Sequence, residues 1–208
     1  NALYGKLYPL LADGDYAWND DLTVLTCKIN PAAKWSDGTP VTADDVVATW
    51  DISAKIENGT YTGYAPYIAG IENVDGAVVI KAKLTEDGKP ANPLQVLCFL
   101  SGVYIVQKDW AEALCAKHND DATAIRTDPT PDVVYSGPYG PYFANAQLVA
   151  FVRNDNYWGQ DASLWGKLPA PKYMAHTIYK DNDATLIAFK AGQIDVNQQF
   201  IANVQKLI

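Results

Sequence analysis

The sequence predicts a mixed α/β fold, for three reasons. Residues 22–29 alternate between the two faces of a strand, and residues 43–55 carry the signals of a capped helix. Near the C-terminal end, a strand at 174–179, a helix at 183–191 and a short strand at 194–196 follow one another. A strand, a helix and a second strand in this order are typical of a βαβ unit, and so of an α/β layer.

Length, composition and charge exclude several classes of protein. The chain has 208 residues, 49% of them hydrophobic and 19% charged, with a formal net charge of −8. A chain of this size buries roughly 70% of its surface on folding, so it needs no disulfide or metal to form a core. Its longest apolar stretches are shorter than the ~20 residues of a membrane-spanning helix. An acidic chain without a Lys/Arg cluster repels phosphate backbones, so we expect no nucleic-acid partner.

The three cysteines, Cys27, Cys98 and Cys115, are an odd number and show no CxxC spacing. Each lies in a mostly apolar stretch, which favours buried thiols over a disulfide. Cysteine usage therefore does not indicate the cellular compartment.

The chain begins without Met and ends within an apolar pattern, so we expect both ends to be cut. The absence of a signal peptide therefore excludes no compartment.

The first third of the chain contains the clearest local signals. A short helix or strand at 2–11 precedes the half-buried strand at 22–29. The turn formers of 36–40 then lead to Thr42. We predict that the Thr42 hydroxyl caps the helix over residues 43–55.

Asp44 and Asp45 lie in the first turn of this helix. Two carboxylates can perform general acid and base chemistry when both are aimed at one substrate from different environments. Adjacent residues on a helix point apart, so we interpret the pair as favourable charges at the positive end of the helix dipole.

The middle of the chain alternates loops and short elements. We predict an irregular loop at 57–70 and a hairpin at 71–84 around its Asp–Gly dipeptide. Residues 94–106 could form a buried helix followed by a short strand, which periodicity alone does not decide, and 109–117 indicate a helix. Residues 118–132 have the composition of a surface linker.

The last third opens with a turn at 136–143, which contains two prolines and two glycines. A strand follows at 148–153, and a turn at 153–159 carries two large aromatics. The helix predicted near the C-terminal end is capped by Gly192.

Motifs for catalysis and metal binding are absent from the sequence, including GxSxG, Walker, HExxH and EF-hand patterns. His118 and His176 lie far apart without a ligand pattern. Asp181 and Asp183 flank Asn182 in a pattern that could touch calcium, but the rest of an oxygen-rich loop is missing. We therefore interpret Asp183 as a helix cap, and we expect no catalytic residue, no metal and no cofactor.

Aromatic side chains make up 12% of the chain and can either fill the core or contact a ligand. We assign Trp35 and Trp50 to the core. Tyr61, Tyr64 and Tyr67 lie in a glycine-rich stretch and could reach a ligand, with burial in the core as the alternative.

Four segments, in order along the chain, carry a resemblance to a known family. They read LTVLTCKINPAAKWSDGTPVTADDVVATWD at 22–51, SGPY at 136–139, RNDNYWG at 153–159 and AFKAGQIDV at 188–196. The first resembles the strand, WSDG turn and capped helix of the family 5 extracellular solute-binding proteins almost position by position. That family comprises the peptide and oligosaccharide receptors of bacterial and archaeal ABC importers.

The resemblance implies a periplasmic-binding-protein-like lobe of class II. Family members usually consist of two lobes joined by hinge strands, and this chain resembles most of the first lobe, with the second lobe absent. Residues 1–51 and 133–208 would form the α/β subdomain of that lobe, and 52–132 an inserted smaller subdomain. The segments LPAPKYM and AFKAGQIDVNQQFIANV look closer to the oligosaccharide-binding branch than to the oligopeptide-binding one.

The resemblance also implies where a ligand binds. Two segments match ligand-contacting positions of the family: Asn197, Gln198, Gln199 and Phe200, and Gly5, Lys6 and Leu7. The first segment follows a predicted strand, and loops beyond the carboxyl ends of strands line the crevice in open α/β folds. The amide of Gln198 or Gln199 could hydrogen-bond a peptide backbone or sugar hydroxyls.

The implied function is capture of an oligopeptide or oligosaccharide outside the cell between two closing lobes, followed by docking on an ABC permease. Such a receptor is no enzyme, is a monomer, and resides in the periplasm or on a lipid anchor at the outer face of the cell membrane. One rival interpretation is a secreted carbohydrate-active enzyme or a lectin-like module. The enzyme would need two carboxylates that converge in an aromatic cleft. A sensor input domain is the other rival. Because the second lobe would supply half of the enclosing surface, we expect the 208 residues alone to bind weakly or not at all.

Overall fold

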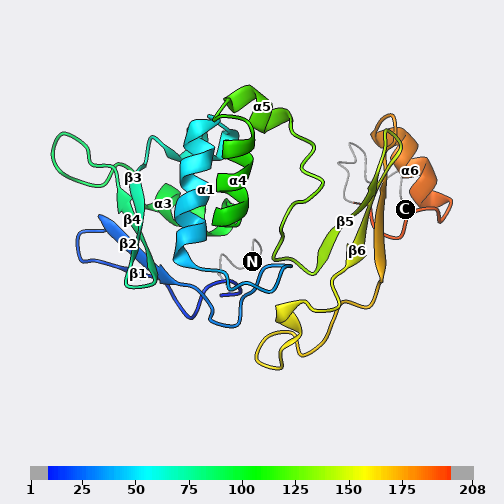
Figure 1. The fold of residues 1–208 in the computed structure, drawn as a ribbon, viewed down its shortest axis with the longest axis horizontal. Coiled ribbons are helices and arrows are strands. Elements are labelled where there is room, and N and C mark those ends of the chain that lie inside the picture. Colours follow the sequence, from blue (N-terminus) through cyan, green and yellow to red (C-terminus); the bar gives the residue numbers. More distant parts are fainter. Residues whose placement is uncertain (1–8, 198–208) are drawn as a thin grey trace. The chain divides into compact units, whose positions relative to one another are not determined.

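The computed structural model describes residues 9–197 and confirms a mixed fold of helices and two antiparallel sheets (Figure 1). Most of the element predicted at 2–11 therefore lies outside the described residues. The described chain divides into two compact units, the first containing 9–138 and 154–168 and the second 139–153 and 169–197.

A four-stranded antiparallel sheet organises the first unit, in the order β1-β2-β4-β3. Its strands are β1 (Ala17–Trp18), β2 (Val24–Lys28), β3 (Ile68–Val74) and β4 (Ala77–Ala82). The register pairs Leu25 with Ile80 and Cys27 with Val78, and all four side chains are buried. The strand predicted at 22–29 is confirmed.

The hairpin predicted at 71–84 is also confirmed, with its tight turn at Asp75 and Gly76. Both residues have positive φ, 51° and 83°. A type I′ turn requires this conformation at both central residues, and its twist matches that of the two strands. Gly76 adopts it without a steric penalty.

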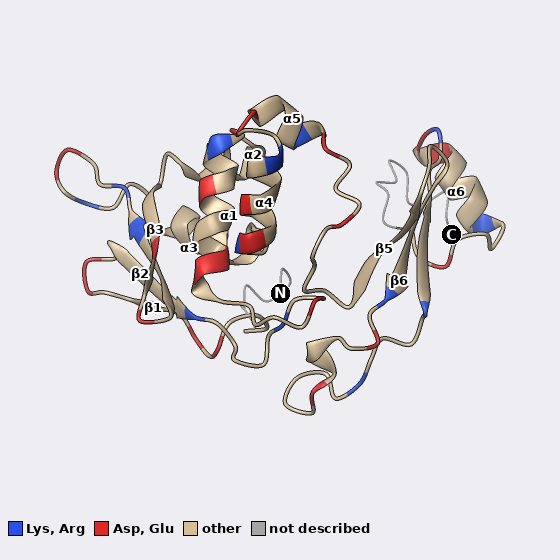
Figure 2. Ribbon diagram, in the orientation of Figure 1, with Lys and Arg blue, Asp and Glu red and all other residues tan. Residues whose placement is uncertain are grey.

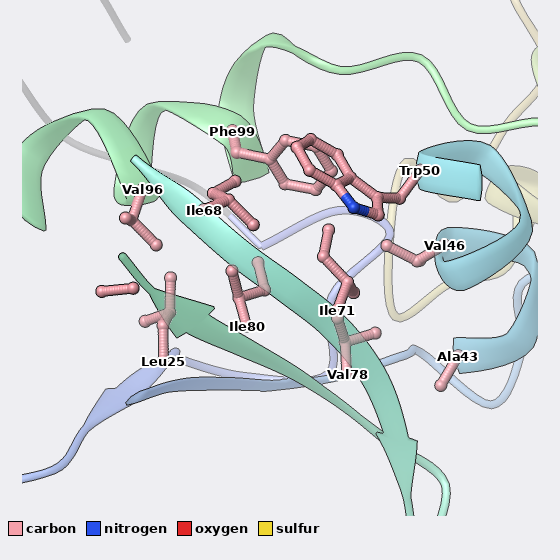
Figure 3. Close-up of a cluster of buried hydrophobic side chains, with 11 residues drawn as sticks. Leu25, Ala43, Val46, Trp50, Ile68, Ile71, Val78, Ile80, Val96 and Phe99 are labelled. Carbon is pink, nitrogen blue, oxygen red and sulfur yellow. The ribbon is translucent and has the colours of Figure 1, made fainter. Parts of the chain in front are cut away.

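Helices α1 (Ala43–Lys55) and α3 (Pro93–Gly102) pack on the buried face of this sheet (Figure 3). Trp50 of α1 and Phe99 of α3 meet edge to face above the strands, with ring centroids 5.9 Å apart. Trp35 is also buried, so both core tryptophans are confirmed. The helix predicted at 43–55 is confirmed at both ends.

The carboxylate of Asp45 is buried where three segments meet. It accepts hydrogen bonds from the indole N–H of Trp35 (3.1 Å) and from the backbone N–H groups of Thr42 (2.8 Å) and Lys108 (2.8 Å). Thr42 is the N-cap of α1, as predicted, and forms a capping box with Asp45. Lys108 begins helix α4 (Lys108–Lys117), so the negative charge lies at the N-termini of two helices. Asp45 is confirmed as a helix-stabilising charge.

The chain between α3 and α4 is held against the same region by two further side chains. Gln107 donates from Nε2 to Asp37 (2.8 Å) and to the hydroxyl of Thr39 (2.9 Å). The hydroxyl of Thr49, on α1, accepts from the backbone N–H of Val106 (2.9 Å). These bonds replace strand pairing, so the short strand that the sequence predicts after α3 does not form, whereas helix α4 is confirmed.

Short helices occupy two stretches that the sequence predicts to be irregular. The stretch 57–70 contains α2 (Gly59–Tyr64), and the side chain of Asn58 caps it. The stretch 118–132 contains α5 (Ala122–Thr127), and the side chain of Asp121 caps it. The loop prediction at 57–70 is wrong because Asn and Asp favour both turns and N-caps, and the sequence does not separate the two.

Asp128 anchors the chain that follows α5. Its side chain is 4% exposed and accepts from Nζ of Lys117 (2.7 Å) and from the backbone N–H of Thr130 (2.7 Å). Nε2 of His118 lies 2.6 Å from the same carboxylate. The hydrogen bond from Lys117, followed by those with His118 and Thr130, holds the pKa of the Asp128 carboxyl well below its usual range.

The second unit contains a three-stranded antiparallel sheet in the order β5-β6-β7 and one helix. These elements are β5 (Tyr139–Ala144), β6 (Leu148–Arg153), β7 (Tyr173–Thr177) and α6 (Asn182–Lys190). Strand β5 occupies most of the stretch 136–143 that the sequence predicts to be a turn. Pro141 is tolerated there because β5 is an edge strand of the described sheet, with an irregular register between Pro141 and Phe143.

The βαβ unit predicted near the C-terminal end is not formed within the described residues. Helix α6 ends before Gly192, whose φ of 69° is the left-handed conformation at which glycine ends a helix. Residues 194–196 have no strand partner in the described part of the chain and form no strand there. Asp181, rather than Asp183, caps α6 by accepting from the N–H of Ala184 (2.8 Å).

The compact units divide the chain at points other than the subdomain boundaries that the resemblance implies. The implied boundary at 51–52 falls inside α1. Residues 154–168 belong with the first unit, where the indole N–H of Trp158 donates to the carbonyl of Ser136 (2.9 Å). The scheme of 1–51 with 133–208 and an inserted 52–132 stays a prediction.

We predict that Asp45→Asn lowers the free energy of unfolding by about 3 kcal/mol, because buried N–H groups lose a charged acceptor. Asp44→Asn is the matched control. The Asp44 side chain is half-buried and accepts from Asn73 at the surface, so we expect a loss of about 0.5 kcal/mol. Urea unfolding of both variants measures the difference, and equal losses would contradict the central role of Asp45.

We predict that Asp128→Asn lowers the melting temperature at pH 7 and that the difference from the parent shrinks below about pH 4. A carboxyl with a lowered folded-state pKa stabilises the fold above its unfolded-state pKa, and this contribution is lost as the pH falls through the folded-state value. Thermal melts between pH 7 and pH 2 test this. The exposed Asp132→Asn serves as control, and a pH-independent difference for Asp128→Asn would refute the prediction.

Candidate functional site

Six of the seven residues predicted to contact a ligand lie outside the described residues: Gly5, Lys6, Leu7, Gln198, Gln199 and Phe200. The seventh, Asn197, is half-buried and follows α6 in the second unit. The role of all seven stays a prediction.

The three tyrosines that could have reached a ligand are partly buried and pack against the core of the first unit. The ring of Tyr61 packs on Trp50 with centroids 5.0 Å apart, and Tyr64 meets Phe99 edge to face at 5.5 Å. Tyr67 packs against the same cluster. All three tyrosines therefore contribute to packing in the first unit, and a ligand contact of any of them stays a prediction.

The first unit carries an apolar groove of about 930 Å³, bounded by segment 9–16, by the sheet at Cys27 and Val78, and by α3 with the chain after it. Most of its described lining residues are apolar, among them Leu10, Leu11, Leu97, Leu100, Val103 and Ile105. Asp15 is the one charged residue among its described lining residues. Small-molecule sites usually enclose roughly 300–1,000 Å³ with mostly apolar walls and few polar groups, and the groove matches this description.

Tyr104 is 95% exposed and lies between Val103 and Ile105, which both line the apolar groove. A large aromatic ring normally stabilises a fold by being buried, so its exposure on an anchored segment contributes little to folding. The sequence analysis did not single out Tyr104. In the sequence Tyr104 is a tyrosine inside an apolar run. Such a residue looks the same as a buried core residue, so no sequence signal separates it.

A second concavity, of about 580 Å³, lies between α1 and α4. Alanines of both helices and Val47 and Ile52 of α1 line it together with Asp44, Asp51 and Glu112. Figure 2 shows acidic residues on both α1 and α4. Lys55, which also lines it, pairs with Asp120 at 2.7 Å.

Among the described residues, no three His, Cys, Asp or Glu side chains gather in a way that could hold a metal ion. His118 is engaged with Asp128, and the ring of His176 meets Phe151 edge to face at 6.0 Å. Between residues 9 and 197, no helix has both the length and the apolar character that crossing a membrane requires.

The three cysteines are free thiols. Cys27 and Cys115 are buried, as predicted, and burial raises the pKa of both thiols. Cys98 is only half-buried.

The fold of this chain occurs in binding proteins of ABC transporters. The mannohexaose-bound periplasmic oligopeptide-binding protein of Thermotoga maritima superimposes with a TM-score of 0.75 at 23% identity, over 99% of this chain and 35% of that chain. At this level of identity the similarity establishes the fold alone.

Sequence comparison identifies the family. The family model described as bacterial extracellular solute-binding proteins, family 5, middle matches residues 6–208, so the chain belongs to that family. The probable peptide-binding protein YejA of Agrobacterium fabrum is 30% identical over 193 residues, covering 92% of this chain and 30% of YejA. The peptidoglycan-binding protein YepA of the same organism is 31% identical over 194 residues, covering 92% of this chain and 29% of YepA. The chain thus spans about 30% of the length of the curated relatives it matches.

We predict that a thiol reagent at pH 8 labels Cys98 faster than Cys27 and Cys115. A raised pKa leaves less thiolate at a given pH, and burial also limits access of the reagent. Mass spectrometry of alkylated peptides measures the three rates. In urea the three should become similar, and rapid labelling of native Cys27 would contradict the prediction.

Proposed function

We propose that the protein is the extracytoplasmic substrate-binding component of an ABC importer and captures oligopeptides or oligosaccharides. The observation that carries this proposal is the family match over residues 6–208. The names of YejA and YepA, both binding proteins rather than enzymes, support it.

In this proposal, ligand is enclosed between two lobes, and the present chain contributes much of the first. Gln198 and Gln199 hydrogen-bond the ligand through their amides, with Asn197 and Phe200 beside them. Residues 5–7, Gly5, Lys6 and Leu7, contact it from the edge of the same lobe. Closure of the lobes couples ligand binding to a shape that the permease recognises.

The proposal further includes a monomeric protein without catalytic activity, held in the periplasm or by a lipid anchor on the outer face of the membrane.

The rival carbohydrate-active enzyme gains no support from the apolar groove. Such an enzyme needs a pair of converging carboxylates, and Asp15 is the one carboxylate among the described residues that line the groove. A sensor input domain and a transport protein differ in their partner. Binding of the liganded protein to a permease would therefore favour the transport protein over the sensor domain.

Native mass spectrometry of the full-length protein tests the proposal, because a ligand enclosed between two closed lobes dissociates slowly. We expect a bound peptide mixture or a ladder of sugar units, identified by fragmentation. A protein that carries no ligand and binds neither peptides nor oligosaccharides would refute the proposal.

We predict that Gln198→Ala and Gln199→Ala together weaken binding of the co-purified ligand by about tenfold or more, the loss expected for two hydrogen bonds to a buried ligand. The matched control is Gln193→Ala, which removes an exposed amide a few residues earlier. Isothermal titration of the full-length protein measures the affinities. Equal affinities for the double variant and the control would remove these residues from the site.

A further inference from the structure

Helices α1 and α4 lie side by side and are joined at both ends (Figure 1). Both begin at the carboxylate of Asp45, which accepts from the backbone N–H groups of Thr42 and Lys108. At the opposite ends, Nζ of Lys55 lies 2.7 Å from the carboxylate of Asp120. The two helices therefore run in the same direction, and the α1–α4 concavity of about 580 Å³ lies between them.

Much of the lining of the α1–α4 concavity is apolar. Val47 and Ile52 are half-buried, so both keep apolar surface that another molecule could cover. Ala48, Ala111 and Ala116 also line it, and their short side chains leave room between the two helices. Removing this apolar surface from water is favourable.

The charged residues of the α1–α4 concavity are mostly acidic. Its described lining contains four carboxylates against two ammonium groups: Asp44, Asp51, Glu112 and Asp120 against Lys55 and Lys108. Lys55 is paired with Asp120, and Asp44 accepts from the amide of Asn73 (2.7 Å).

Two of these carboxylates have no such partner. Asp51, on α1, and Glu112, on α4, are exposed, and no hydrogen bond or salt bridge joins either side chain to another described residue. The fold therefore gains little from these two charges. Their oxygen atoms are available to a cation from outside the chain.

An apolar surface with free carboxylates beside it fits one kind of side chain. Arginine and lysine have an aliphatic stem that packs along apolar surface and a charged head that pairs with carboxylates. Arginine is also enriched among the residues that contribute most to protein–protein binding. The α1–α4 concavity therefore fits a basic segment of a protein partner.

We propose that the α1–α4 concavity receives a long cationic side chain, arginine or lysine, from an extracytoplasmic segment of the permease. This inference rests on the proposed function, which requires the permease as a protein partner. It assigns the docking surface within the first unit and makes Asp51 and Glu112 the residues that pair with the cation.

The test measures binding of the full-length, liganded protein to the permease and its ATPase subunits in lipid nanodiscs. We expect the double variant Asp51→Asn, Glu112→Gln to bind the permease about tenfold more weakly, with an unchanged melting temperature and an unchanged ligand affinity by isothermal titration. The affinity of the parent should fall between about 50 mM and about 300 mM NaCl, and that of the double variant should fall less.

The matched control is the double variant Asp20→Asn, Asp21→Asn. Both residues are exposed in the same unit and do not line the α1–α4 concavity, so the control changes the net charge by the same amount. We expect it to bind the permease like the parent.

Several outcomes would overturn the inference. Equal permease affinities of the double variant and its control would do so while the proposed function stands. A loss of ligand affinity in the double variant would assign the two carboxylates to the ligand instead. A lower melting temperature with unchanged permease binding would indicate that the protein's own chain covers the concavity. A parent protein that binds neither a ligand nor the permease would overturn both the inference and the proposed function.

Discussion

The first unit depends on one buried negative charge, the carboxylate of Asp45. It accepts from the indole N–H of Trp35, from the backbone N–H of Thr42, the N-cap of α1, and from that of Lys108, the first residue of α4, so two helix N-termini and a tryptophan meet at a single group. A buried carboxylate without a cation is tolerated only when hydrogen bonds replace its hydration. The WSDG turn, the capped helix and the start of α4 are therefore joined through one side chain.

Polar contacts in the same region also hold the chain between α3 and α4. The chain from α3 to α4 carries Tyr104 and two groove residues, and it is held by Thr49, Gln107 and Asp45 rather than by a strand. Side-chain anchors leave the backbone free to follow the groove, whereas strand pairing would have aligned it with the sheet. The same polar contacts thus fix the path of the chain from Val106 to Lys108.

The two units differ in how much of their apolar surface the described residues cover. The first has a continuous core beneath α1 and α3. In the second, Ala150, Thr185 and Ala188 are buried, while Tyr142, Phe143, Tyr173 and Ile187 are each about half exposed or more. The chain spans about 30% of the length of its relatives, so ligand binding is best measured on the full-length protein.

Local signals in the sequence determined most elements of the first unit. The Asp–Gly hairpin, the alternating strand at 22–29 and the capped helix at 43–55 each arise from neighbours a few residues apart, so their prediction succeeded. Tertiary structure decided the rest. Asp45 reaches Lys108 across 63 residues, and no local pattern announces that contact. An apolar run likewise does not show which member, Val103, Tyr104 or Ile105, stays outside, because exposure depends on what the rest of the chain packs against it.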